Sequence, residues 1–130
     1  MAAITDLDIL LKSMSPELID GNYVFCTVNG PLSDYLAMEP IATFREQEGL
    51  TLVVKEEVAT AGQLEFDAVF SLITLSVHSS LEAVGLTAAF ANKLSSYGIS
   101  ANVIAGYYHD HIFVQKDKTE QAMSALKEFA

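Results

Sequence analysis

The run at residues 68–77 constrains the fold of this chain more than any other stretch. It is almost continuously apolar and ends at a polar segment that begins with His78. A short apolar run without alternation is typical of a strand that is covered on both faces of a sheet. A helix is predicted at residues 82–96, with Gly98 just past its end, so we expect a central strand with this helix packed on its sheet.

Strand and helix signals continue on both sides of that run. Further strands are predicted at residues 22–28, 41–46, 50–55, 99–108 and 111–115, and further helices at residues 5–14, 56–61 and 117–129. Asp20-Gly21 indicates a turn before the first strand, and Gly49 allows a tight hairpin between its neighbouring strands. Asp117 and Glu120 predict a capping box for the last helix. Residues 32–40 fit either a helical turn or a loop, and the whole pattern predicts a compact α/β arrangement.

The order of these elements repeats once along the chain. Strand, hairpin, strand, lysine and helix follow one another at residues 42–61 and again at residues 101–126. The first half also supplies a strand in the place that the run at 68–77 takes in the second half. We therefore expect two related βαββα-like units, residues 1–67 with an abbreviated crossover and residues 68–130.

The composition indicates which classes of partner the protein can bind and in which cellular compartment it is expected. With 17 acidic and 7 basic residues, the formal net charge is -10, which repels phosphate backbones and anionic membranes, so we expect neither nucleic acid nor membrane as a partner. The start of the chain lacks the features of a signal peptide, and no apolar run is long enough to span a bilayer, so we expect a cytoplasmic protein. The single cysteine, Cys26, lies in an apolar strand, where a buried and inert thiol is expected.

Two histidines flank an acidic residue near the tip of the second predicted hairpin. On a strand, His109 and His111 would face the same side and could bind one metal ion, with His78 joining through the fold. A small metal-dependent enzyme that uses these three histidines is therefore one hypothesis. Asp110 is instead expected to mark the hairpin turn, which would separate the two rings, so a polar hairpin tip or a subunit contact is favoured and no metal site is predicted.

The segment that follows the central strand is the main candidate for binding. Ser79 and Ser80 come after His78, but no G-x-S-x-G elbow and no acidic partner support a catalytic nucleophile. Amides at the start of a helix can instead receive an anionic group such as a carboxylate. A purely structural turn is the alternative, and the residues alone favour it.

Glycine and tyrosine residues near this segment have simpler explanations. Gly85 is expected inside the start of the helix, where close packing explains a small residue. Gly106 in the predicted strand indicates a bulge or the close approach of another backbone or a ligand. Tyr107 and Tyr108 are expected to pack within the sheet, although they could also line an interface.

Four segments together carry a family resemblance: residues 41–46, 48–53, 78–88 and 106–111. They resemble small bacterial proteins in which an ACT domain stands alone, and the resemblance covers nearly the whole chain. It implies an α+β, ferredoxin-like βαββαβ fold with two related ACT-like units, antiparallel sheets and helices on one face. The carboxyl half also resembles the tandem ACT regulatory units of aspartokinase type, and ACT domains commonly bind amino acids or other small metabolites.

The resemblance also implies where a ligand binds. In aspartokinase-type ACT pairs the ligand lies near the first strand-to-helix turn and the facing second strand. The residues at these two places are His78, Ser79, Ser80, Leu81, Glu82, Ala83, Val84, Gly85, Leu86, Asn102, Val103, Ile104 and Ala105. Typical ACT units carry a Pro-Gly or similar pair at this turn, whereas the glycine of this chain comes later, at Gly85.

We therefore expect a non-catalytic regulatory or sensor protein that binds a small molecule, an amino acid, and forms a homodimer by sheet extension. No cofactor and no metal are expected. Backbone amides around residues 80–85 would receive the carboxylate of the ligand, and Asn102 or a nearby backbone carbonyl would accept its amine. The alternative is a structural or adaptor module that mediates protein association without a ligand.

Overall fold

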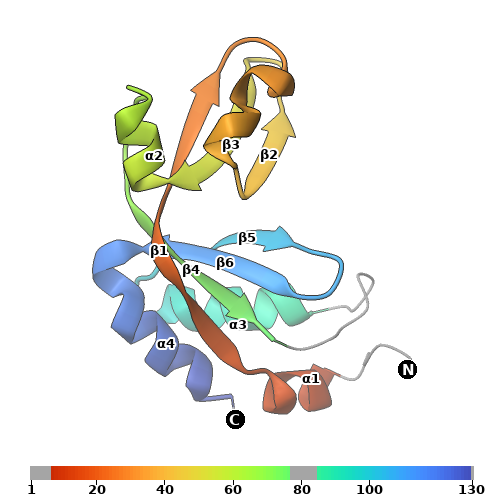
Figure 1. Ribbon diagram of the computed structural model, residues 1–130. Coiled ribbons are helices and arrows are strands. Elements are labelled where there is room, and N and C mark those ends of the chain that lie inside the picture. The colour runs from red at the N-terminus through yellow and green to blue at the C-terminus, as the bar shows by residue number, and fades with distance from the viewer. Residues whose placement is uncertain (1–6, 77–84, 130) are drawn as a thin grey trace. The chain divides into compact units, whose positions relative to one another are not determined.

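The structure is a computed structural model that describes residues 7–76 and 85–129 (Figure 1). In chain order its elements are α1 (Leu7–Ser13), β1 (Pro16–Val28), the 3₁₀ helix η1 (Leu32–Met38), β2 (Ala42–Arg45), β3 (Leu50–Lys55), α2 (Glu56–Ala61), β4 (Phe70–Leu75), α3 (Leu86–Ser96), β5 (Asn102–Ala105), β6 (Asp110–Gln115), the 3₁₀ helix η2 (Lys116–Lys118) and α4 (Thr119–Lys127). The strands hydrogen-bond to one another in the order β2-β3-β1-β4-β6-β5.

The chain forms two compact units that are not consecutive in sequence. Residues Gly21–Phe70 form one unit, here called the central unit, and the residues before and after this segment form the other, the terminal unit. Strand β1 contributes to both units, because it runs across residue 20. Read from β4, the terminal unit runs β4-α3-β5-β6-α4, and the strand on the other side of β4 is β1. The last strand of this βαββαβ pattern therefore comes from the amino-terminal end of the chain.

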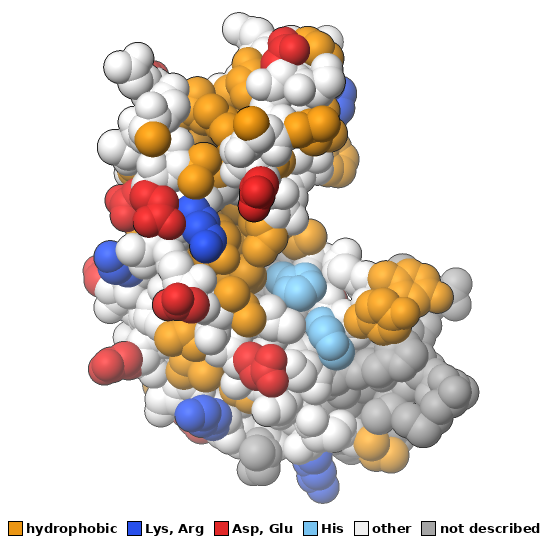
Figure 2. All heavy atoms as spheres, in the orientation of Figure 1, with side chains coloured by type: hydrophobic (Ala, Val, Ile, Leu, Met, Phe, Trp, Pro, Cys, Tyr) orange, Lys and Arg blue, Asp and Glu red, His pale blue; other side chains and the backbone are white. Residues whose placement is uncertain are grey.

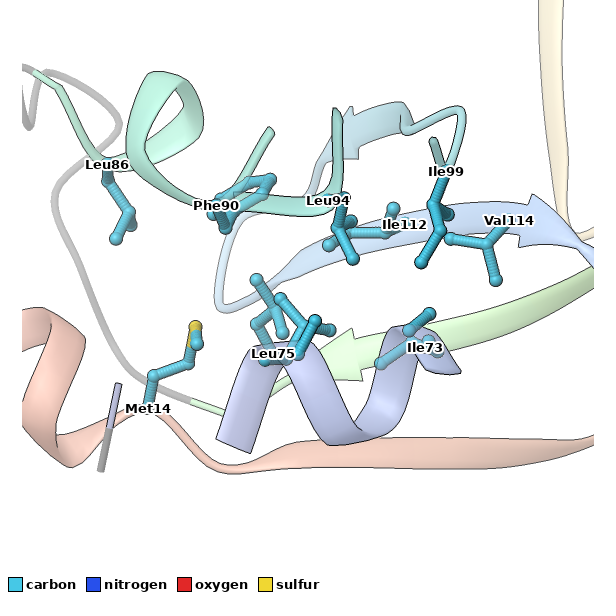
Figure 3. Close-up of a cluster of buried hydrophobic side chains, with 12 residues drawn as sticks. Met14, Ile73, Leu75, Leu86, Phe90, Leu94, Ile99, Ile112 and Val114 are labelled. Carbon is cyan, nitrogen blue, oxygen red and sulfur yellow. The ribbon is translucent and has the colours of Figure 1, made fainter. Parts of the chain in front are cut away.

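The terminal unit has its core between strands and helices (Figure 3). Ile73 and Leu75 of β4 lie in one buried cluster with Ile112 and Val114 of β6. Residues two apart on a strand face the same side of the sheet. The helical members of this cluster are Leu86, Phe90 and Leu94 of α3 and Ala122, Ala125 and Leu126 of α4. Both helices thus cover the same face of β4 and β6, as the ferredoxin-like expectation requires.

The central unit is built on two antiparallel strand pairs. Strand β3 pairs with β1 from Tyr23↔Lys55 to Val28↔Leu50, and with β2 from Ala42↔Val53 to Arg45↔Leu50. Its core is a second cluster, made of Val24, Cys26, Val28, Leu50, Leu52, Val54 and Ala59, with η1 and α2 contributing partly buried apolar side chains. Cys26 is buried, as predicted, and its burial raises the pKa of the thiol. The ambiguous segment after β1 is therefore helical, because it covers this core.

Several predicted elements agree with the structure. Both hairpins form, α2 has the predicted bounds, and β4 is buried along almost its whole length. Gly98 follows the last residues of α3 with a φ of 74°, as expected for a glycine at the C′ position. Two ACT-type units were expected at residues 1–67 and 68–130. The compact units differ from this division in two ways: residues 1–20 join the terminal unit, and residues 68–70 belong to the central unit. The division into two repeats itself stays a prediction.

Strand β1 is longer than predicted. It begins at Pro16 and passes through Asp20-Gly21, which had indicated a turn. Gly21 has a φ of 104°, so the glycine signal marks an irregularity inside the strand. Proline is tolerated at the first residue of a strand because its missing amide is not needed there. Strand β5 is conversely shorter than the predicted 99–108, because only residues 102–105 pair with β6.

Helices α3 and α4 also begin differently from the prediction. Helix α3 starts at Leu86, with Gly85 outside it as the N-cap, so the glycine is a junction residue instead of a packing residue inside the helix. Helix α4 starts at Thr119 and has no side-chain cap, so the capping box at Asp117 is wrong; a turn of 3₁₀ helix takes its place. Tyr97 follows the buried Phe90 and Leu94 at helical spacing, yet it is 40% exposed and its hydroxyl donates to the Glu128 carboxylate 2.6 Å away.

Glu39 has an unusual backbone conformation just after η1. Its φ of 49° and ψ of 56° lie in the left-handed region, where a side chain costs roughly 1–2 kcal/mol, and it precedes Pro40, which restricts it further. We expect Glu39→Gly to raise the free energy of unfolding by about 0.5–1 kcal/mol, after the extra unfolded-state entropy of glycine is subtracted. Urea unfolding measures the effect. Glu39→Ala is the control, because it removes the carboxylate but keeps the strained Cβ; an equal gain in both variants would contradict this explanation.

Candidate functional site

The predicted binding turn is only partly described. Residues 78–84 of the predicted site lie outside the described residues, whereas Gly85, Leu86 and the whole of β5 lie within them. Leu86 is 3% exposed and belongs to the core cluster, so only its backbone can serve a ligand. Figure 3 shows its side chain directed into that cluster.

Gly85 forms the junction between the turn and α3. Its φ of 88° is in the region that favours glycine, and its carbonyl accepts the amide of Ala89 at 2.9 Å. Within residues 7–76 and 85–129, no side-chain hydrogen bond caps the helix there. The first amides of an α-helix have no partner within the helix, and they carry the positive end of its dipole. This end of α3 is therefore suited to a carboxylate.

Strand β5 is the second part of the predicted site. It pairs with β6 from Asn102↔Phe113 to Ala105↔Asp110, and no described strand pairs with its other edge. The Asn102 side-chain amide donates to the Phe113 carbonyl at 3.2 Å, which orients the side chain. Its side-chain oxygen is an acceptor, the group that a ligand amine requires.

The histidine pair lies at the start of β6 and next to β4. The Thr74 hydroxyl and His111 Nδ1 are 3.0 Å apart, and Thr74 is only 8% exposed. His109 Nδ1 is buried and has no hydrogen-bond partner among the described residues. Asp110 was predicted to mark the hairpin turn, but this prediction is wrong, because Asp110 pairs with Ala105 in the sheet. The tip of the hairpin is formed by residues 106–109 instead.

Gly106 is explained by the tightness of this tip. Its amide donates to the His109 carbonyl at 2.9 Å, and a Cβ at Gly106 would lie 2.9 Å from that oxygen and 3.0 Å from His111 Nε2. The close approach that the sequence indicated is therefore within the hairpin itself. Tyr107 and Tyr108 do not pack within the sheet, as had been expected, but are 75% and 64% exposed, because they form the tip.

The hairpin with His109 and His111 does not form a metal site with other described residues. No group of three histidine, cysteine or acidic residues that could hold a metal ion occurs among residues 7–76 and 85–129. His78, the third member of the hypothetical metal set, lies outside the described residues. Figure 2 shows histidine side chains at the surface, so the pair is partly accessible to solvent.

His111 makes stability depend on pH. Burial lowers its pKa and His109 lowers it further, against a smaller opposite effect of Asp110. The folded state thus disfavours the protonated ring, so the stability contribution is complete above the unfolded-state pKa of about 6.5 and is lost as the pH falls through it toward the folded-state pKa. We expect the urea midpoint to fall between pH about 7.5 and about 5, and to fall less in His111→Gln. Equal slopes in the two proteins would contradict this assignment.

Comparison with known proteins decides the family. The ACT domain family model matches residues 2–71, and a second ACT domain model matches residues 68–128. The chain belongs to the ACT domain family. This ACT protein is 72% identical to a protein of unknown function from Vibrio cholerae, described as a possible transport protein, over 95% of both chains with a TM-score of 0.90. No curated protein matches it.

Two more distant structures share the tandem ACT fold. The ligand-free regulatory subunit of aspartate kinase from Thermus thermophilus aligns with a TM-score of 0.69 at 9% identity, over 92% of this chain and 98% of that one. A protein from Agrobacterium tumefaciens aligns with a TM-score of 0.70 at 15% identity, over 89% and 88%. These likenesses support the ferredoxin-like fold. Among the described residues of the ACT protein, no helix has the length and apolar character needed to cross a bilayer.

Proposed function

We propose that this ACT protein is a non-catalytic regulatory or sensor protein of the cytoplasm that binds an amino acid. ACT domains of this kind occur in regulatory proteins, and the regulatory subunit of aspartate kinase shares the fold. The observation that carries the proposal is the junction at Gly85, where a left-handed glycine starts a helix that no side chain of the described residues caps. Such a junction offers backbone amides to an anionic group without help from a charged side chain.

The proposed binding mode divides the ligand between α3 and β5. Amides at residues 80–85 and the first turn of α3 receive the carboxylate, and the Asn102 side-chain oxygen or a backbone carbonyl of β5 accepts the amine. The Asn102 hydrogen bond to the Phe113 carbonyl fixes this oxygen before a ligand arrives. A preorganised acceptor costs less ordering entropy when the ligand binds.

Sheet extension would complete the assembly. Strand β5 lies at one end of the strand order, with unpaired backbone groups on its outer side among the described strands. Exposed edges of this kind add a strand from another chain readily. We propose that two copies of the ACT protein pair in this way, which would bring the ligand to a seam between copies. A ligand that favours one pairing would shift the population of that state.

A change at the first turn of α3 tests this binding mode. Thr87 is exposed on that turn, so Thr87→Glu would place a competing carboxylate at the helix amino terminus without disturbing the core. We expect the affinity for the bound amino acid to fall by about tenfold, equivalent to about 1.4 kcal/mol, in isothermal titration calorimetry. Thr87→Gln, equal in size but uncharged, is the control and should retain the wild-type affinity. Equal affinity in Thr87→Glu and Thr87→Gln would show that the ligand does not bind at the amino terminus of α3.

The second candidate function is an adaptor without a ligand. The exposed pair Tyr107 and Tyr108 favours it, because large exposed aromatic residues are enriched at protein interfaces. Their rings contact each other edge to face with centroids 5.0 Å apart, which presents one combined apolar surface. Under this alternative, Tyr107→Ser with Tyr108→Ser would abolish partner capture while no amino acid alters the protein in calorimetry.

A further inference from the structure

The central unit contains a hollow that is separate from the Gly85 junction. Its volume is about 510 Å³, within the usual range of small-molecule sites. The lining residues that matter here are Tyr23, Met38, Glu39, Lys55, Glu57 and Val58. All of them belong to residues 21–70, so the hollow lies within one compact unit.

The floor of the hollow is apolar and fixed. Tyr23 is 5% exposed, and Met38 and Val58 pack against the buried cluster of the central unit. Three secondary-structure elements therefore hold the floor: β1, η1 and α2. A floor of this kind can cover the hydrocarbon part of a small ligand, because apolar surface that leaves water stabilises the complex.

Charged side chains of both signs stand around this floor. Lys55 ends β3 opposite Tyr23, and its Cε lies 3.8 Å from the position that a Cβ on Gly21 would take. Glu39 follows η1 and Glu57 lies in the first turn of α2. Within the part of the chain that the structure describes, no ion pair joins these three side chains, whereas Lys93 and Glu128 pair in the terminal unit.

Glu39 is also the residue with the strained backbone described above. A glutamate in the left-handed region before a proline is unfavourable, and glycine or asparagine would fit there better. Glu39 is the C-cap of η1, and its backbone amide donates to the Leu36 carbonyl. This hydrogen bond fixes the backbone from which the Glu39 side chain extends at the edge of the hollow.

We infer that this hollow binds a small zwitterion with an apolar side chain. The ammonium group is held by the carboxylates of Glu39 and Glu57, the carboxylate by the ammonium of Lys55, and the apolar part lies on Tyr23, Met38 and Val58. Charge-assisted hydrogen bonds of this type are stronger than neutral ones. The inference goes beyond the proposed function, because it concerns another unit and none of the residues at the Gly85 junction.

A matched series of compounds tests the charge requirement. Leucine carries both charges, 3-methylbutylamine only the ammonium, and 4-methylpentanoate only the carboxylate on a similar hydrocarbon. Methionine and phenylalanine extend the series to other apolar side chains. We expect at least one of the three amino acids to bind in calorimetry, the matched amine at least about tenfold more weakly, and the acid not measurably. Two results would overturn the inference: 4-methylpentanoate binding with the same affinity as leucine, or no binding of any compound in the series.

Variants locate the site and separate it from the Gly85 junction. Lys55→Met and Glu57→Gln are expected to weaken binding at the hollow by about tenfold or more, while Glu48→Gln, on the hairpin of the same unit, leaves it unchanged. Thermal unfolding of each variant checks that the fold is intact. Thr87→Glu is expected to leave binding at the hollow unchanged. Unchanged binding in both Lys55→Met and Glu57→Gln would overturn this inference, whatever Thr87→Glu does; unchanged binding in Thr87→Glu with a loss in Lys55→Met would support the hollow and contradict the junction.

Discussion

Replacing Phe90 by alanine is expected to lower the free energy of unfolding by about 3–5 kcal/mol. Phe90 is 0% exposed, and Figure 3 shows its ring pointing from α3 into the cluster formed with β4 and β6. Its removal loses the transfer free energy of the ring and leaves a cavity that packed neighbours fill only in part. Chemical unfolding followed by circular dichroism measures the change.

Two further variants make this first result interpretable. Phe90→Leu keeps most of the volume and should cost less than the alanine variant, so a measurable transition remains even if Phe90→Ala fails to fold. Asn92→Ala, on the exposed side of the same helix, should change stability little or raise it slightly, because alanine favours helices. A loss below about 1 kcal/mol in Phe90→Ala would show that α3 does not cover the sheet of the terminal unit.

Replacing Leu52 by alanine is expected to lower the free energy of unfolding by about 2–5 kcal/mol. Leu52 is 0% exposed and lies in β3, between β1 and β2, in the cluster of the central unit. Phe44→Ala is the matched control: it removes a larger side chain from the edge strand of the same unit, but one that is 71% exposed. We expect the control to cost less than about 1 kcal/mol. Equal losses in urea unfolding would mean that the central unit has no core of its own.

The apolar strand and the hairpins could be predicted because their signals are local. A run of apolar residues alone predicts that β4 is buried on both faces of the sheet. Gly49 lies in the hairpin loop that its conformational freedom indicated. Gly98 is equally local, since a helix end needs a residue that tolerates the left-handed region. The family resemblance added the βαββαβ pattern, which periodicity does not specify.

The errors arose where distant contacts outweigh local signals. Asp20-Gly21 reads as a turn, yet β1 continues through it because residues 16–20 join the terminal unit and the rest of the strand joins the central unit. Tyr97 has the spacing of a buried residue, but a hydrogen bond to Glu128, 31 positions later, holds it outside. No window of sequence contains either partner.

The candidate sites show the same limit. The resemblance located the Gly85 junction and β5, and these residues do lie at a helix start and a sheet edge. Nothing in the sequence grouped Glu39, Lys55 and Glu57, since scattered acidic residues are typical of a solvated face. The left-handed conformation of Glu39 is visible only in the backbone geometry. Its position before Pro40 does not predict it from the sequence.

Binding of an amino acid by this ACT protein is the central claim, and thermal unfolding in the presence of each common amino acid tests it most directly. A ligand at about one hundred times its dissociation constant stabilises the folded state by about 2.7 kcal/mol, enough to raise the melting temperature by several degrees. We expect one amino acid or a small chemical group of them to do so, and a smaller shift with the same compound in Thr87→Glu or Lys55→Met. An unchanged melting temperature with every amino acid would contradict the account.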